Sequence, residues 1–443
     1  MGVDMNKKYK SFSLITFGVE SCNSFCSYCS ASSAMNYNMG VNLSKDLEAE
    51  CRRVNKQNVE EAQFDFPAVE KRMDEYFGYT KDKHEEMKGT LLHVDCWGAD
   101  GLCNFDSLVE ETYFLEDYCK EREWKLDLHT STNGLACVVK EWTDFLHEHN
   151  IHLQLSHDGL AQWIRTKTLD PMDLPEVRAL IRDGTIDWIN CCLTFWNWNI
   201  FDNIDYYNAK LREIFPEVWS TTEVASPEID AIYRKLFIKI NHIYDSTYDI
   251  KAKNVNGKYR TRYYDALKNS EIGDLAFNNR PDLAEQYNIP ELAHVLDEYI
   301  NQWYRVYDKF KNMNSNDYSL LPYKNYLWSQ LHRYKFLKSI DDANAGSCYA
   351  FQRGLRDKTF VIDTIGKYCQ CNLIDSAHKV LNPTAEKPSY CKGCKYYLSA
   401  ECNHCGSVNF ADKCTYLYRW NSLLESIHYL EVTNNKGACK CKH

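Results

Sequence analysis

The sequence predicts an α/β protein in which parallel strands alternate with helices. Three observations lead to this prediction: six short apolar segments, helical periodicity in the segments between them, and glycine or proline at several boundaries. Such alternation implies parallel strands joined by crossover helices, which form either a layered sheet or a barrel. The predicted strands are 12–17, 90–96, 125–131, 151–156, 185–194 and 236–243.

The predicted helices follow from apolar spacing and from their end signals. In the segment 65–78, Pro67 lies at the start and Gly78 at the end. Between them, apolar residues recur at helical spacing: Phe66, Val69, Met73, Tyr76 and Phe77. The other helices of the alternation are predicted at 106–119, 138–149, 174–183 and 203–215. Gly184 ends the helix 174–183.

The region from about 244 to 345 is predicted to be mostly helical. Its clearest helix is 289–311, which carries apolar residues along one face. Aromatic residues here are candidates for a substrate groove, but such stripes are more often packed core, and we expect core. These residues are Trp303, Tyr304, Tyr307, Tyr326 and Trp328.

Length and composition are ordinary for a globular protein. The 443 residues are enough for two or three domains, with 44% hydrophobic and 26% charged residues. A net charge of −10 argues against a nucleic-acid partner, because phosphate binding favours a basic surface. The sequence has no apolar run of membrane length, and residues 1–10 are polar. Neither a spanning helix nor a signal peptide is therefore predicted.

The number of cysteines is unusual. There are 20, and ten of them follow Ala345. In an intracellular chain of this size, so many cysteines indicate metal ligands rather than disulfides. We therefore expect a cytoplasmic protein in a reducing compartment.

The first cysteine group follows the strand predicted at 12–17. Cys22, Cys26 and Cys29 have the spacing C-x3-C-x2-C. Three thiolates so close together can hold three irons of a 4Fe–4S cluster and leave the fourth iron open. A small molecule can chelate that open iron through an amine and a carboxylate. The alternative is three ordinary buried thiols, since free cysteine is often a core residue.

This spacing, with Tyr28 before the last cysteine, resembles the radical S-adenosylmethionine (SAM) family. In that family the open iron binds SAM, and an aromatic residue at the place of Tyr28 packs near the adenine. The resemblance implies a partial (βα)6 TIM-like barrel with functional residues at the carboxyl ends of the strands.

Three further strand ends carry the resemblance. The segment 97–102, Trp-Gly-Ala-Asp-Gly-Leu, stands where the family has Gly-Gly-Glu-Pro, so Gly98 and Asp100 are implied to hold the SAM ammonium. Thr-Asn-Gly at 132–134 and Ser-His-Asp-Gly at 156–159 resemble two later family motifs, which implies that Asn133 and Ser156 contact the ribose or the carboxylate of SAM. Arg165 is a candidate partner for that carboxylate. Each motif alone is also a common turn sequence.

The last hundred residues carry a second cysteine series. It resembles the SPASM extension of radical SAM enzymes that modify peptides and proteins. The resemblance implies one auxiliary cluster on Cys391, Cys394, Cys402 and Cys414, and another on Cys348, Cys371 and Cys405, with Cys369 as a candidate fourth ligand. Several spacings differ from the commoner pattern. Two C-x2-C pairs are also typical of a zinc ribbon, which is the alternative for this region.

Together the resemblances imply three domains. They are a barrel at 12–245, a helical bridging segment at 246–345 and a small Cys-rich α+β SPASM domain at 346–443. The implied cofactors are SAM, the 4Fe–4S cluster that binds it and two auxiliary 4Fe–4S clusters. The implied reaction is reductive cleavage of SAM to a 5′-deoxyadenosyl radical, which abstracts hydrogen from a substrate.

The substrate we expect is a peptide that gains a crosslink, thioether or epimerised centre. Expected partners are a separate leader-peptide recognition protein and an electron donor such as flavodoxin or ferredoxin. Maturation of a sulfatase, oxidation of a small molecule and a zinc-stabilised interaction protein without catalysis are the alternatives. Four cysteines near strand ends stay open as catalytic candidates: Cys96, Cys103, Cys191 and Cys192. His152 and His157 are expected to be structural.

Overall fold

The computed structural model describes residues 11–17, 46–59, 64–97, 100–166, 169–193, 197–220, 222, 224–242, 292–311, 318–339, 359–363, 366 and 423–428. The chain divides into two compact units. The first comprises Met1–Ser156, Thr168–Asp187 and Gly354–Val380, and the second comprises His157–Lys167, Trp188–Arg353 and Leu381–His443. The three predicted domains stay predictions, because much of 246–345 and of 346–443 lies outside the described residues.

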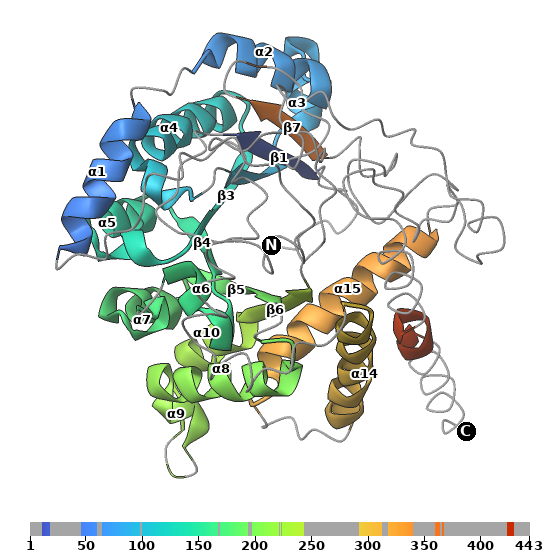
Figure 1. Ribbon diagram of the computed structural model, residues 1–443. Helices are drawn as coiled ribbons and strands as arrows, with labels where there is room; N and C mark the ends of the chain where they lie inside the picture. Colours follow the sequence, from blue (N-terminus) through green and yellow to red (C-terminus); the bar gives the residue numbers. More distant parts are fainter. Residues whose placement is uncertain are drawn as a thin grey trace. The chain divides into compact units, whose positions relative to one another are not determined.

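The first unit contains a parallel sheet. Its strands are β1 (Ser11–Phe17), β2 (Leu91–Trp97), β3 (Lys125–Thr132), β4 (Ile151–Ser156) and β7 (Thr359–Asp363), in the order β4-β3-β2-β1-β7 (Figure 1). Every neighbouring pair is parallel. The α/β class and four of the predicted strands are therefore confirmed. The strand β7 was not predicted, and it pairs with β1 from nearly 350 residues away in the sequence.

Six α-helices in the described part of the first unit connect or cover these strands. They are α1 (Leu47–Val59), α2 (Phe66–Phe77), α3 (His84–Met87), α4 (Phe105–Glu121), α5 (Lys140–Glu148) and α7 (Pro175–Arg182). In Figure 1, α4 lies along β3, and α5 follows it on the same side. The helices predicted at 65–78, 106–119, 138–149 and 174–183 are confirmed, whereas α1 and α3 were not predicted.

The helix α2 illustrates how local signals set its bounds. The Asp65 carboxylate accepts a hydrogen bond from the Ala68 backbone N–H at 3.1 Å, which caps the amino end. Gly78 ends the helix in the left-handed conformation, at φ 68°. A buried arginine then joins α2 to the end of α4: Arg122 donates to Asp74 and Glu70, each at 2.8 Å, and its guanidinium lies 3.7 Å from the Tyr118 ring centroid.

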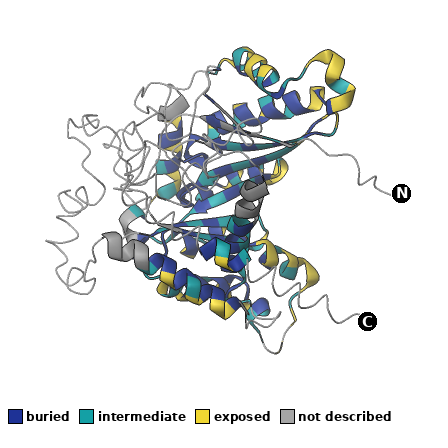
Figure 2. Cartoon of the chain, turned by 90° about the vertical axis from the view of Figure 1, so that its right-hand side faces the viewer, coloured by how far each residue is buried: buried dark blue, intermediate teal, exposed yellow. Residues whose placement is uncertain are grey.

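Burial alternates along the strands. Leu92, Val94 and Cys96 of β2 are buried, as are Leu128 and Thr130 of β3, while the residues between them are half-buried. Figure 2 shows the same contrast in the helices, where buried positions follow one side and exposed positions the other. Because successive side chains of a strand point to opposite faces, the buried set packs under the helices and the half-buried set lies on the other face.

The described part of the second unit contains a parallel strand pair and further helices. Strand β5 (Ile186–Leu193) begins in the first unit and continues in the second, where it pairs with β6 (Phe237–His242). The α-helices are α6 (Trp163–Thr166), α8 (Ile200–Ile214), α9 (Pro216–Trp219), α10 (Pro227–Lys235), α14 (Leu292–Lys311) and α15 (Leu321–Ser339). The predicted elements at 185–194, 203–215, 236–243 and 289–311 are confirmed.

The expectation of packed core is confirmed for three of the five aromatic residues singled out in α14 and α15, while Tyr304 and Trp328 are half-buried. Trp303, Tyr307 and Tyr326 are buried, and the rings of Trp303 and Tyr326 are 5.3 Å apart. The buried Tyr299 hydroxyl donates to the Ile240 carbonyl of β6 at 2.6 Å. These contacts fix both helices on the strand pair. Within the described residues, no helix is both long and apolar enough to cross a membrane.

A buried acid under α4 gives a test of this packing. The Glu111 side chain lies beneath the helix layer beside Thr16 of β1 and Cys96 of β2, and burial raises its pKa to about 7, although the two neighbours oppose the shift. The folded state therefore keeps the proton to higher pH than the unfolded chain, whose ordinary value is 4.5. The resulting stabilisation is complete below pH 4.5. It declines as pH rises and is lost once pH passes about 7.

We expect Glu111→Gln to remove this pH dependence. The wild-type free energy of unfolding should fall by on the order of 3 kcal/mol relative to Glu111→Gln between pH 4.5 and pH 8. Urea unfolding at several pH values measures the difference. The exposed neighbour Glu110 provides the control, because Glu110→Gln should follow the wild-type profile. Parallel profiles for wild type and Glu111→Gln would contradict the prediction.

Candidate functional site

The carboxyl ends of β1, β2 and β3 lie at one edge of the first unit's sheet. Phe17 pairs with Trp97, and Cys96 pairs with Thr130, so the three strands end nearly level. The chain segments that follow them begin at this edge. In sequence they carry the cysteine run, the segment 97–102 and Asn133. Ligands of open parallel sheets bind at such edges.

Asp100 joins the segment after β2 to the segment after β3. Its side chain is buried, and one carboxylate oxygen accepts the backbone N–H of Asn133 at 2.7 Å. The other oxygen accepts the backbone N–H of Cys103 at 3.1 Å. The Thr132 hydroxyl lies 3.4 Å from the first oxygen. Asp100 therefore holds two strand ends together, a role that the sequence did not indicate. Its predicted contact with the SAM ammonium stays a prediction.

Gly101 is required by a close approach of backbones at the same edge. Its N–H donates to the Ser131 carbonyl at 2.8 Å. A Cβ atom at this position would lie 1.9 Å from the Thr130 hydroxyl oxygen, which itself donates to the Cys96 carbonyl. The glycine after Asp100 is therefore explained by packing alone.

Asn133 begins the turn that follows β3. Its side-chain oxygen accepts the Leu135 backbone N–H at 2.9 Å, which is an Asx turn, and the residue is buried. Ser156 is the last residue of β4 and is half-buried. Both residues stand at strand ends, as predicted, while their predicted contacts with SAM stay predictions.

In the second unit, Asp158 organises the loop after His157. Its fully buried carboxylate accepts the Cys192 backbone N–H at 3.1 Å and lies 3.4 Å from an Arg165 Nη1. The Asp158 carbonyl accepts from the Asn197 amide at 2.6 Å. The Arg165 side chain is 11% exposed. Arg165 was predicted to pair with the SAM carboxylate, and the structure gives it a carboxylate partner within the protein.

His157 has a structural role, as expected. It is fully buried, and its carbonyl accepts the Tyr207 hydroxyl at 2.7 Å. Its backbone N–H donates to the Asn190 carbonyl of β5 at 3.0 Å. These bonds attach the loop that follows β4 to β5 and to α8.

Three of the four cysteines left open by the sequence are buried. Cys96 and Cys103 belong to the first unit and Cys191 to the second. Burial raises the pKa of Cys96 and of Cys191 well above the ordinary thiol range. Such thiols are poor nucleophiles, because the thiolate is the reactive form. Cys192 is half-buried, so it is the most accessible of the four.

The predicted cluster ligands lie outside the described residues. This holds for the first group, Cys22, Cys26 and Cys29, together with Tyr28 and Gly98. It also holds for the second series: Cys348, Cys369, Cys371, Cys391, Cys394, Cys402, Cys405 and Cys414. Their roles stay predictions.

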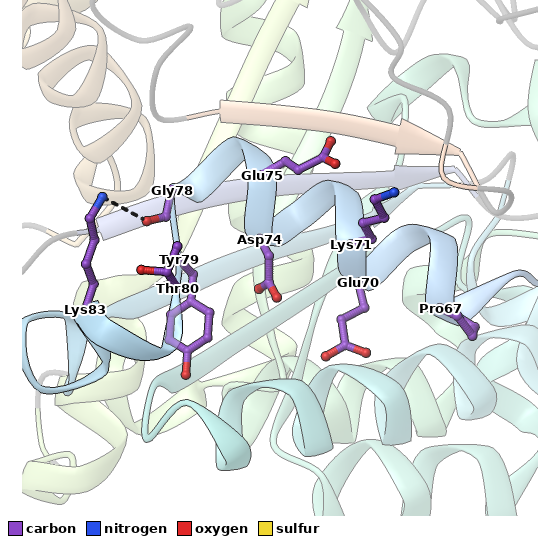
Figure 3. A pocket seen from close by; sticks show the side chains of 9 residues that line it. All are labelled: Pro67, Glu70, Lys71, Asp74, Glu75, Gly78, Tyr79, Thr80 and Lys83. Carbon is purple, nitrogen blue, oxygen red and sulfur yellow. Dashed lines mark hydrogen bonds between the residues drawn. The ribbon is translucent and has the colours of Figure 1, made fainter.

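A surface pocket of about 640 Å³ lies elsewhere, along α2 (Figure 3). Glu70 and Asp74 point to the same side of this helix in Figure 3, and both bind Arg122. None of the nine lining residues belongs to the predicted site. Because its acidic side chains already have a cationic partner, we assign this pocket no function.

One group of polar residues was missed by sequence reasoning. His93 of β2 and Asp127 and His129 of β3 meet on the half-buried face of the sheet. Hydrogen bonds from His129 and His93 hold the pKa of Asp127 well below its usual range. His152, which was expected to be structural, adjoins this group, because its ring lies 5.3 Å from that of His129. The sequence did show polar residues at alternate positions of three successive strands, which could have pointed to this group. Only the register of the strands, however, brings these residues next to one another.

Comparisons with known proteins give similarity at the level of structure only. No protein-family profile and no curated protein sequence matches the chain. Among solved structures, native anSMEcpe with bound AdoMet superposes with a TM-score of 0.48 at 14% identity, covering 96% of this chain and 100% of that one. The same protein with bound AdoMet and the Cp18Cys peptide gives 0.48 at 16% identity, covering 96% and 99%.

Proposed function

We propose that this chain is a radical SAM enzyme whose first cluster is bound by Cys22, Cys26 and Cys29. One observation carries the proposal. Cys22 is the fifth residue after Phe17, where β1 ends, and that end lies level with the ends of β2 and β3. The C-x3-C-x2-C run therefore follows closely, in sequence, on a strand end of the kind at which parallel α/β folds bind their ligands.

The described residues at this edge suit the amino-acid part of SAM. Asp100 supplies a carboxylate that accepts hydrogen bonds from the Asn133 backbone N–H and from the Thr132 hydroxyl. The Asn133 side chain adds an amide, whose oxygen accepts the Leu135 backbone N–H. An ammonium group needs acceptors and a carboxylate needs donors, and this set offers both. We propose that the segments after β2 and β3 hold the ammonium and carboxylate of SAM, with Gly98 and Ser156 beside them.

The cleavage of SAM is chemistry that the iron–sulfur cluster and SAM themselves supply. When bound, the reduced cluster supplies the electron that cleaves SAM to methionine and a 5′-deoxyadenosyl radical. The protein's part is to position SAM, to exclude water and to hold the substrate C–H bond near the radical. Interlocked loops such as those joined by Asp100 contribute rigidity to this positioning.

We further propose a peptide or protein substrate. The support is the C-terminal cysteine series from Cys348 to Cys414, whose order resembles that of SPASM domains with two auxiliary 4Fe–4S clusters. Such clusters can take up the surplus electron when a substrate radical closes into a new bond. A flavodoxin or ferredoxin would supply the first electron, and a separate protein would recognise the leader of a ribosomally made precursor.

Anaerobic reconstitution tests the proposal. The full chain, supplied with iron and sulfide and then reduced with dithionite, should convert SAM to 5′-deoxyadenosine, measured by mass spectrometry. A colourless protein that holds zinc in place of iron and leaves SAM intact would overturn the proposal and favour the zinc-stabilised interaction protein.

A separate experiment tests the class of substrate. Peptides encoded by neighbouring genes should lose hydrogen mass only in the presence of SAM and the reduced enzyme. If those peptides stay intact while a sulfatase peptide is oxidised at its active-site Cys or Ser, the enzyme is a sulfatase-maturating enzyme instead.

A further inference from the structure

The half-buried face of the first unit's sheet carries a row of histidines and carboxylates. His93 lies on β2, Asp127 and His129 on β3 and His152 on β4. The register pairs His93 with Asp127 and His129 with His152 across neighbouring strands. Buried residues such as Leu92 and Leu128 occupy the positions between them and face the opposite side.

Three of these side chains have their ligand atoms together. His93 Nδ1 lies 2.8 Å from one Asp127 oxygen, and His129 Nε2 lies 3.0 Å from the other. All three ligand atoms fall within 4.8 Å of one another. A tetrahedral ion with bonds of about 2.0–2.1 Å needs ligand atoms roughly 3.3 Å apart. The observed separations therefore require only small side-chain movements to admit an ion.

The backbone holds this group in place. His93 and Asp127 are directly opposite each other on paired parallel strands, and His129 is two residues further on the same face of β3. Little conformational freedom is left to lose when a ligand binds. In each neutral imidazole the proton can move to the other ring nitrogen, which changes the tautomer and not the net charge. The nitrogen that faces Asp127, Nδ1 of His93 or Nε2 of His129, then carries a lone pair that can bind an ion.

We propose that His93, Asp127 and His129 bind one divalent transition-metal ion of the zinc type. Two imidazole nitrogens and one carboxylate are a donor set that such ions prefer. Three protein ligands leave a fourth position of a tetrahedral ion for water or a substrate group, as in catalytic rather than closed structural sites. His152 lies against His129, and its Nδ1 is 3.8 Å from Asp187 in the same unit, so a second pair of donors adjoins the site.

This metal site is distinct from the predicted iron–sulfur clusters. Its ligands include no sulfur, and His129 precedes Asn133 by four residues, roughly 13 Å along β3. The second histidine–carboxylate group of the described residues, His84, Glu85 and Glu123, is less suited. Its carboxylates are exposed, and Glu123 already pairs with Lys88 at 2.6 Å.

Zinc binding by the full-length chain tests the inference. Wild type and variants are treated with a chelator, equilibrated with Zn²⁺ and separated from free ions. Wild type should then retain about one zinc ion per chain more than Asp127→Asn or His129→Gln. His147→Gln is the matched control, because this exposed histidine also pairs with a carboxylate, Asp183 at 3.0 Å, and should keep the wild-type zinc content.

The zinc X-ray absorption edge separates this ion from zinc on thiolates. The spectrum of wild type minus that of Asp127→Asn should show nitrogen and oxygen ligands and no sulfur. Equal zinc content in wild type, Asp127→Asn and His129→Gln, or a difference spectrum with sulfur ligands, would overturn the inference. If one variant fails to fold, His93→Gln gives the same comparison. SAM cleavage is not measured, so failure here is distinguishable from failure of the proposed enzyme function.

Discussion

Replacing Cys26 with alanine should reduce SAM cleavage to the rate without enzyme. The proposed first cluster has only three protein ligands, so loss of one leaves two thiolates, and a 4Fe–4S cluster is then not retained. Iron content should fall by about four ions per chain, and 5′-deoxyadenosine should disappear from the reaction. Both quantities are measured on anaerobically reconstituted protein, by iron assay and by mass spectrometry.

The control for this prediction is a cysteine outside every predicted ligand set. Cys439 lies in the Lys-rich tail, and Cys439→Ala should keep the iron content and the cleavage rate of wild type. Unchanged 5′-deoxyadenosine formation by Cys26→Ala would show that the cysteine run is not the SAM site. Loss of activity in both variants would indicate general thiol damage and would equally remove the support for a specific role of Cys26.

Replacing Asp100 with alanine should lower the free energy of unfolding by roughly 3–5 kcal/mol. The change leaves the backbone N–H groups of Asn133 and Cys103 without their acceptors in a buried place. Asp100→Asn keeps one carbonyl oxygen and should cost about half as much. Urea unfolding of the three proteins measures the series. Equal stability of wild type and Asp100→Ala would contradict the structural role.

The same variants separate the structural role of Asp100 from its predicted role toward SAM. Binding of SAM is measured at a temperature where Asp100→Asn is folded. If the carboxylate also holds the SAM ammonium, the dissociation constant of Asp100→Asn should rise at least about tenfold, because a charge-assisted hydrogen bond is lost. A dissociation constant equal to that of wild type would leave Asp100 with the structural role alone.

Much of the secondary structure was predictable because its signals are local. The helix 65–78 has a capping Asp65, an early Pro67 and a terminal Gly78, and α2 begins and ends within a residue of these limits. By contrast, β7 was missed, although four of its five residues, Thr-Phe-Val-Ile, are of types that favour strands. It becomes a strand by pairing with β1, and that pairing is not encoded in its own sequence.

In the candidate site, too, the sequence indicates which residues are present, and the fold decides which contacts they make. The turn residues Asp100 and Asn133 were recognisable from motifs at strand ends, yet their mutual hydrogen bond depends on β2 and β3 being neighbours. Arg165 is predicted to meet a ligand carboxylate, which stays a prediction, and the fold also places it 3.4 Å from Asp158, seven residues before it. A motif specifies which group is present, and packing decides which partner it meets.

The sequence by itself determined the α/β class, the order of most elements and the cysteine spacing from which the radical SAM proposal is drawn. These properties reside in periodicity and spacing, which are read along the chain. Only the tertiary structure decided that His93, Asp127 and His129 lie within reach of one ion. The reason is physical: parallel pairing sets side by side residues more than thirty positions apart, and the register alone selects which of them are opposite.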